Sequence, residues 1–171
     1  MLFNSYAFIW LFLPVVWGVF FLAARYRHEA AAAWLALASL FFYGYWDMHY
    51  VPLLLLSITV NYQISKQISR NIENGLQRQA KLWLIAGLVF DLGLLGHYKY
   101  TRFFLENWVA LTGSNINLVD IILPLGISFF TFTQIAYLAD CYKGIVKERN
   151  PIHYLLFITY FPHLIAGPIL H

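Results

Sequence analysis

The sequence has few charged residues and almost no cysteine. Only 11% of its 171 residues are Asp, Glu, Lys or Arg, whereas 61% are hydrophobic and 19% are aromatic. Soluble proteins carry roughly 25% charged residues, so this chain has too little polar surface to cover itself in water. The single cysteine, Cys141, excludes an internal disulfide framework and a zinc site built from cysteines alone. We expect Cys141 to be a small buried hydrophobic side chain.

Common catalytic and binding motifs are also absent. The sequence contains no His-Glu-x-x-His zinc helix, no nucleophile elbow and no phosphate-binding glycine loop. Its formal charge of +3 comes from eleven Lys and Arg residues, which are scattered in short clusters between apolar runs. Nucleic-acid-binding proteins gather such residues on one face. We therefore predict no nucleic-acid partner, no metal site and no bound cofactor.

What the chain has instead is six long apolar runs. An uncharged stretch of about 18 residues can cross the roughly 30 Å hydrocarbon layer of a membrane as a helix. The runs are 6–24, 30–46, 50–65, 82–98, 121–139 and 152–170, and only the fourth contains a charged residue. They are continuously apolar rather than alternating, which excludes the strands of a membrane barrel. The expected fold is an all-α polytopic membrane bundle with five or six transmembrane helices, the sixth run either spanning or re-entering.

A further helix is expected at the membrane interface, within residues 97–120. Phe103, Phe104, Trp108 and Leu111 would fall broadly on one side of it, as in an amphipathic helix lying in the headgroup region. Gly113 and Ser114 would end this helix, and Asp120 precedes the fifth run in the place of a capping acid.

The basic residues predict the orientation of the chain, because cytoplasmic loops of membrane proteins collect Lys and Arg. With the N-terminus outside, the connections after the first, third and fifth runs are cytoplasmic. These connections hold nine basic residues: Arg25, Arg27, Lys66, Arg70, Arg78, Lys81, Lys143, Lys147 and Arg149. The outer connections hold two, Lys99 and Arg102. We expect a multi-pass protein of the bacterial inner membrane with its N-terminus outside.

Polar residues inside these runs are the candidate functional residues. An acid at membrane depth costs about 2.5–3.5 kcal/mol, so Asp91 needs a partner, a proton or water. It would either line a substrate path or join two helices as a hydrogen-bonded acid. Asn61 and Gln63 are expected to form bonds between helices. No residue is predicted to be catalytic from the pattern alone.

Two further features add pathway candidates. Ser128, Thr131 and Gln134 would form a polar stripe along the fifth run, as a tunnel wall or as a packed helix interface. His163 lies in "FPHLIAGP", where Pro162 and the Gly167-Pro168 pair predict a broken helix. Broken helices at membrane depth generally face a cavity. His163 is thus either a pathway residue or a hydrogen-bonded structural histidine.

Five stretches in order carry a family resemblance. They are "LFFYGYWD" at 40–47, "VNYQISKQI" at 60–68, "LLGHYKYTRFF" at 94–104, "LPLGISFFTFTQIAYLADCYKG" at 123–144 and "FPHLIAGPILH" at 161–171. Together they resemble the N-terminal part of the membrane-bound O-acyltransferase family, above all its bacterial branch of alginate O-acetyltransferases and teichoic acid D-alanyl transferases. The resemblance covers nearly the whole chain but about a third of a typical family member.

The resemblance implies that residues 1–171 are the N-terminal portion of one membrane-embedded acyltransferase domain. The family passes an acyl group, here expected to be acetyl, from a cytoplasmic donor to hydroxyls of an extracytoplasmic polysaccharide such as alginate. The implied donor is acetyl-CoA or a carrier-linked thioester. The family's catalytic histidine is expected beyond residue 171, so His171 is not the catalyst and this chain alone is expected to be inactive. Expected partners are the bilayer, a missing C-terminal portion and other polysaccharide-modification proteins.

Three other interpretations of the chain stay open at this point. The gene would be either truncated or split, with the rest of the enzyme on a separate chain. The protein would otherwise be a small transporter-like or scaffold membrane protein, although no internal repeat typical of transporters is visible. A third interpretation is an interaction fragment that dimerises through unpaired helix faces.

Overall fold

The computed structural model describes residues 5–46, 48–112, 124, 126–146 and 150–160, and every regular element among them is helical. This confirms the all-α class. The elements are a π-helical turn η1 (Phe8–Phe12), α1 (Leu13–Tyr26), α2 (His28–Trp46), a 3-10 turn η2 (Met48–Tyr50), α3 (Val51–Glu73), α4 (Gln77–Thr112), α5 (Ile127–Tyr142) and α6 (Pro151–Thr159).

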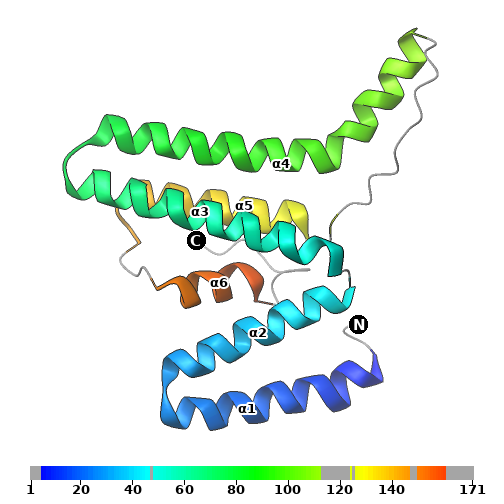
Figure 1. Cartoon of the computed structure of the whole chain (residues 1–171), viewed down its shortest axis with the longest axis vertical. Coiled ribbons are helices and arrows are strands. Elements are labelled where there is room, and N and C mark those ends of the chain that lie inside the picture. The colour runs from blue at the N-terminus through cyan, green and yellow to red at the C-terminus, as the bar shows by residue number, and fades with distance from the viewer. Residues whose placement is uncertain (1–4, 47, 113–123, 125, 147–149, 161–171) are drawn as a thin grey trace.

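The helices are stacked side by side as a slab of antiparallel pairs. Figure 1 shows α4 along one edge, α3 and α5 next to it, then α6, α2 and finally α1 at the opposite edge. The helices α3 and α4 form one hairpin and α1 and α2 another, while α6 joins the two by packing on both α2 and α3. The helix α1 packs on α2 and stands apart from the rest of the bundle.

Local sequence determines where these helices begin and end. Asn150 begins α6 by accepting a hydrogen bond from the Ile152 amide at 2.9 Å, with Pro151 in the first turn, where a missing N–H costs nothing. Just after the C-terminal end of α3, Gly75 adopts a left-handed φ of 71°, and the Leu76 amide donates to the Asn71 carbonyl. This glycine-terminated motif satisfies carbonyls that the helix end leaves free and turns the chain tightly into α4.

Each of the six predicted runs contains a described helix, but α3 extends eight residues beyond the third run, α4 is much longer than the fourth, and only residues 152–160 of the sixth are described. Residues 97–112 continue α4 rather than forming a separate helix, because no Gly or Pro interrupts the chain between Tyr98 and Thr112. The last turns of α4 lean away from the bundle (Figure 1). Residues 113–123 and 161–171 lie outside the described residues, and with them the predicted helix end at Gly113, Asp120 and the broken helix around His163.

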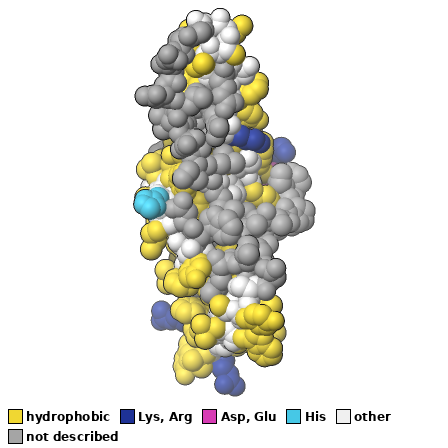
Figure 2. Space-filling view, turned by 90° about the vertical axis from the view of Figure 1, so that its right-hand side faces the viewer, with side chains coloured by type: hydrophobic (Ala, Val, Ile, Leu, Met, Phe, Trp, Pro, Cys, Tyr) yellow, Lys and Arg dark blue, Asp and Glu magenta, His cyan; other side chains and the backbone are white. Residues whose placement is uncertain are grey.

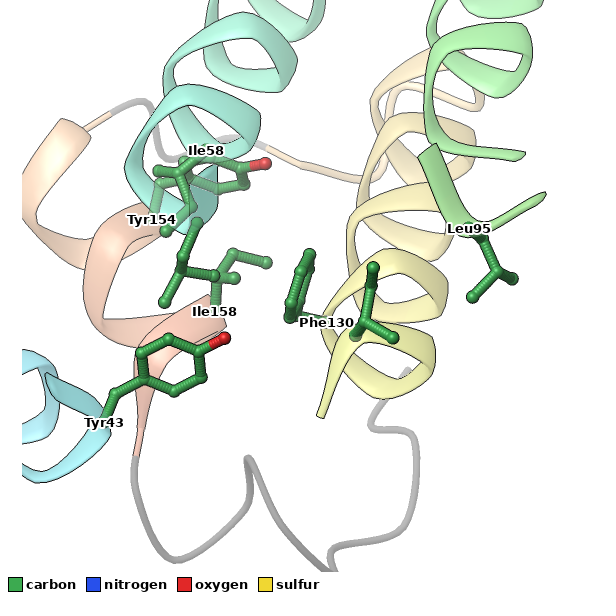
Figure 3. Close-up of a cluster of buried hydrophobic side chains, with 8 residues drawn as sticks. Tyr43, Ile58, Leu95, Phe130, Tyr154 and Ile158 are labelled. Atoms are coloured by element: carbon green, nitrogen blue, oxygen red, sulfur yellow. The ribbon is translucent and has the colours of Figure 1, made fainter. Parts of the chain in front are cut away.

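One hydrophobic core joins five of the helices. It contains Tyr43 of α2, Leu54 and Ile58 of α3, Leu95 of α4, Ile127 and Phe130 of α5, and Tyr154 and Ile158 of α6. Figure 3 shows this cluster. A separate small cluster, in which Phe8, Phe12 and Val16 pack on Ala38 and Phe42, attaches α1 to α2. The helix α1 therefore depends on its contacts with α2 and contributes no residue to the main core.

Two of the described helices are long and apolar enough to cross a membrane, by length and composition. They are Phe8–Tyr26 and Gln77–Thr101. Only 17% and 22% of the residues in their most apolar stretches are buried in the protein. Large hydrophobic side chains stand exposed on both, among them Trp10 and Trp17 on the first and Leu82 and Val89 on the second. Figure 2 shows hydrophobic side chains gathered along one face, with no coloured Asp or Glu in view. A soluble protein would bury the core helices that have this composition.

Gly87 of α4 lies where α3, α4 and α5 are tightly packed. A Cβ atom added there would lie 2.5 Å from Leu138 Cδ1 of α5 and 3.3 Å from Ile64 Cγ2 of α3. Small residues at helix contacts let backbones approach closely in membrane proteins. Gly93, on the same helix, has nothing within 4 Å of such an atom.

Replacing Gly87 by leucine should therefore weaken the bundle, while the same change at Gly93 should not. Both substitutions add the same side chain to α4, so their difference isolates the packing at Gly87. We expect Gly87→Leu to destabilise by about 1–3 kcal/mol, the usual cost of overpacking. The loss of stability is measured as a change in melting temperature of the detergent-purified variants, with size-exclusion chromatography used to monitor unfolding. Equal melting temperatures for the two variants would contradict the close approach.

Candidate functional site

Four buried polar side chains meet where α3, α4 and α5 come together. They are Ser57 and Asn61 of α3, Asp91 of α4 and Gln134 of α5, and none is more than 1% exposed. The Asn61 amide nitrogen donates to Asp91 Oδ1 at 2.7 Å and to Gln134 Oε1 at 2.8 Å. The Ser57 hydroxyl donates to the same Gln134 oxygen at 2.7 Å. We call these four residues the polar cluster.

Helical spacing brings the two α3 members of the polar cluster together. Ser57 and Asn61 are four residues apart and so lie on one face, and the Asn61 amide also approaches the Ser57 carbonyl at 3.1 Å. Ile58, Ile64 and Ile68 are buried on the same side of α3. The face of α3 that packs against the bundle thus carries the polar cluster in the middle of an apolar stripe.

The polar cluster uses only part of its hydrogen-bonding capacity. The Asn61 amide nitrogen has three acceptors within reach but only two hydrogens, so at least one bond is shared. Within α3 to α6, five buried polar atoms have no hydrogen-bond partner among the described residues: Asn61 Oδ1, Asp91 Oδ2, Gln134 Nε2, Thr131 Oγ1 and the Tyr154 hydroxyl. Buried polar atoms are normally satisfied by protein groups or by ordered water. The site thus has donors and acceptors available for water or for another polar group.

Asp91 is held by a neutral amide rather than by a cation. Its carboxyl group is fully buried, and among the described residues its interactions include no ion pair with Lys or Arg. An isolated buried carboxylate is costly, so this environment favours a carboxyl group that shares a proton or a water molecule through Oδ2. Chemically, the cluster can hold a proton or bind water.

No residue in the described part of the chain forms an evident catalytic or metal-binding constellation. No group of three or more His, Cys, Asp or Glu side chains there could hold a metal ion. Cys141 is buried, as its sequence context predicts. The polar cluster includes one acid and no histidine. The described polar residues that meet here form a junction between three helices.

The structure brings three of the predicted pathway residues together. Asp91, Thr131 and Gln134 are fully buried in the region of the polar cluster, whereas Ser128 is only partly buried. His163 lies outside the described residues. The pathway role of all five stays a prediction, and a path along Asp91 and Gln134 would have to open between α3, α4 and α5.

Two polar residues of α3 behave differently from each other. Asn61 links helices, as predicted, and connects α3 to both α4 and α5. The same prediction is wrong for Gln63, which is exposed because it lies two residues further along the helix and faces away from the bundle. Sequence reasoning missed Ser57, although its position one turn before Asn61 could have identified it.

Curated relatives match the chain over nearly its whole length. It is 41% identical to the peptidoglycan O-acetyltransferase of Helicobacter pylori, an alignment that covers 100% of this chain and 37% of the relative. It is 40% identical to the probable alginate O-acetylase AlgI of Pseudomonas aeruginosa, covering 99% of this chain and 33% of the relative. A shorter match, 44% identical over 46 residues, is to the teichoic acid D-alanyltransferase of Bacillus subtilis and covers 26% of this chain and 12% of that protein.

The chain spans about a third of the length of the first two of these relatives. No protein-family model matches the chain, and no solved structure does.

Removing the Asn61 amide should destabilise the helix bundle. In Asn61→Leu the Asp91 oxygen loses its donor in a buried site, which costs about 1–3 kcal/mol, whereas Gln134 keeps the hydrogen bond from Ser57. Gln63→Leu changes an exposed amide on the same helix and serves as the control. Thermal unfolding in detergent compares the two variants.

The pairing of Asn61 with Asp91 is tested by a double-mutant cycle. Replacing both residues by leucine removes donor and acceptor together, so the double variant should be less destabilised than the sum of the single variants. Strictly additive losses would contradict the hydrogen bond between α3 and α4.

Proposed function

Because this chain is homologous to members of the membrane-bound O-acyltransferase family over about a third of their length, we propose that it forms part of an enzyme that acylates an extracytoplasmic polysaccharide. The observation that supports this is the match of the entire chain, at 40–41% identity, to two proteins whose names describe acetyl transfer to a polysaccharide. Peptidoglycan and alginate are the two acceptors named, and both offer sugar hydroxyls. We propose acetyl as the acyl group.

The reaction we propose for the whole protein is transfer from a thioester to a hydroxyl. The acceptor oxygen attacks the thioester carbonyl carbon, the carbon–sulfur bond breaks, and the acceptor's proton is taken by a base and passed to the leaving thiol. The family resemblance implies that a histidine beyond residue 171 acts as this base and that the donor is acetyl-CoA or a carrier-linked thioester. Residues 1–171 would contribute structure rather than the catalytic group.

In this proposal the chain forms one part of a membrane-embedded domain. Its polar cluster would join α3, α4 and α5 into a stable wall, and other polypeptide segments would complete the enzyme around it. The bilayer, the remaining portion of the enzyme and other polysaccharide-modification proteins are the partners we propose. The pathway residues Asp91, Thr131 and Gln134 would then lie inside this wall.

We also propose five or six membrane crossings in a bacterial inner membrane, with the N-terminus outside. Figure 1 supports this orientation. The α1–α2 turn and the α3–α4 turn lie at the same end of the helices. The C-terminal end of α5 and the N-terminal end of α6 lie at that end too. These are the three connections rich in Lys and Arg, and the α2–α3 turn, which has neither, lies at the opposite end. One cytoplasmic side accounts for all three.

The enzymatic proposal is tested by supplying the part of the enzyme that this chain does not span. The chain is expressed in an acetylation-deficient bacterium together with the remaining two thirds of the Helicobacter pylori relative, as a separate polypeptide. Ester-linked acetate is then measured on peptidoglycan, and in a parallel alginate-producing strain on alginate. We expect acetate on one polymer only when both polypeptides are present, since the catalytic histidine and the α3–α5 wall would then occur together.

Two controls make this result interpretable. Co-purification of the two polypeptides shows whether they assemble, and each polypeptide expressed alone should give no acetate. Acetylation by residues 1–171 alone would overturn the assignment of the catalytic group. Assembly of both polypeptides without acetylation of either polymer would count against the proposed function.

The orientation is tested by cysteine labelling in a Cys141→Ala background. Met48→Cys, in the α2–α3 turn, should react with a membrane-impermeant maleimide in intact spheroplasts, because this turn would face outside. Asn74→Cys, in the basic α3–α4 turn, should react only after the membrane is permeabilised. Both native side chains are exposed, so accessibility within the protein is not limiting. The reverse pattern of labelling would contradict the orientation.

A further inference from the structure

A half-open apolar groove runs between the two helices of the outer hairpin. Its walls are Phe12 of η1, Val15 and Val16 of α1, and Trp34, Leu37, Ala38 and Phe41 of α2. The groove has a volume of about 340 Å³, and its lining is almost entirely apolar. This volume falls within the roughly 300–1,000 Å³ range of small-molecule sites. The groove can therefore hold a slender apolar ligand.

The indole N–H of Trp34, a groove residue, already forms a hydrogen bond within the protein. Trp34 donates its indole N–H to the Val16 carbonyl at 3.1 Å, which ties α2 to α1 across the floor of the hairpin. The indole therefore presents apolar ring surface to the groove. A ligand portion inside it can gain burial of apolar area but no hydrogen bond from Trp34.

A cationic turn stands at one end of the same hairpin. Arg25 and Arg27 are exposed in the turn between α1 and α2, next to the exposed His28, with Glu29 as the neighbouring acid. Two arginines against one acid leave a net positive charge there. Guanidinium groups bind phosphate through two parallel hydrogen bonds, and they remain charged at any physiological pH.

The distance between the turn and the groove matches the dimensions of a lipid. At a rise of 1.5 Å per residue, the near end of the groove lies about 14 Å from Arg25 along α1 and about 9 Å from His28 along α2. One leaflet of the hydrocarbon core is about 15 Å thick. An acyl chain that descends from a headgroup at the turn would enter the groove.

From this geometry we propose that the α1–α2 hairpin binds one anionic phospholipid. Its phosphate pairs with Arg25 and Arg27, and one acyl chain lies in the groove between Val15 and Leu37. The charge of the turn selects an anionic headgroup over a zwitterionic one. The inference does not depend on acyl-transfer activity.

The test uses the full chain in nanodiscs made of phosphatidylcholine with a small fraction of phosphatidylglycerol that carries a diazirine in its acyl chain. After illumination, lipid adducts are mapped by peptide mass spectrometry. We expect adducts concentrated on the peptides that contain residues 12–16 and 34–41. Excess unlabelled phosphatidylglycerol should suppress them, and excess phosphatidylcholine should not.

Matched variants separate the two parts of the site. Arg25→Gln and Arg27→Gln should each reduce groove adducts about fivefold, from roughly 1 kcal/mol for each basic residue near a lipid surface. Lys81→Gln removes an exposed basic residue from α4 and should change nothing. Val15→Trp fills the groove from a position that is 51% exposed, and Leu22→Trp, at 57% exposed on the same helix outside the groove, is its control.

Three results would overturn the proposal. One is an even distribution of adducts over α1, α2 and the exposed face of α4 with no effect of headgroup, which indicates an ordinary lipid belt. Another is a loss of adducts that is equal for Val15→Trp and Leu22→Trp. The third is an absence of lipid adducts on residues 12–16 and 34–41 while other peptides of the chain are labelled. If Val15→Trp fails to fold, the arginine variants and the headgroup competition still decide.

Discussion

The bundle depends on one amide that is buried among three helices. Asn61 donates to a carboxylate oxygen of α4 and to an amide oxygen of α5, so a single side chain determines how these helices sit against α3. In a lipid environment apolar packing distinguishes weakly between alternative arrangements, because lipid tails are as apolar as the side chains themselves. Hydrogen bonds among buried polar groups then specify one arrangement, and the close approach at Gly87 brings the three helices within reach.

The same junction explains why the described part of the chain is a wall rather than an active centre. Its polar groups are turned toward one another, and the unused atoms include a carboxyl oxygen and a tyrosine hydroxyl but no nucleophile held beside a base. The outer α1–α2 hairpin has its own small core and its own groove. The described helices thus combine a hydrogen-bonded inner layer with an outer hairpin that carries an apolar groove.

The distribution of Lys and Arg along the chain and the packing of the helices are consistent with one membrane topology. The alternation of basic and non-basic connections along the chain predicts an orientation, and the helix packing places the α1–α2 turn, the α3–α4 turn and the C-terminal end of α5 at one end of the slab. Glycine-terminated turns after α3 and α5 keep two of these connections short. Local backbone chemistry and the membrane's preference for cytoplasmic cations therefore support the same topology.

Sequence alone determined the helical class, the position of most helices, the burial of Cys141 and the family resemblance, because apolar runs, turn residues and ordered motifs are local properties. It also indicated that Asn61 would bond to another helix, but not which residues it would meet. Asp91 is 30 residues away in sequence and Gln134 is 73 away, and periodicity assigns a residue to a face of its helix without naming the helix opposite. Only the tertiary structure decided that these side chains share one site, that Gln63 does not, and that α4 continues through residue 112. Those outcomes depend on how separate helices pack, which no local pattern contains.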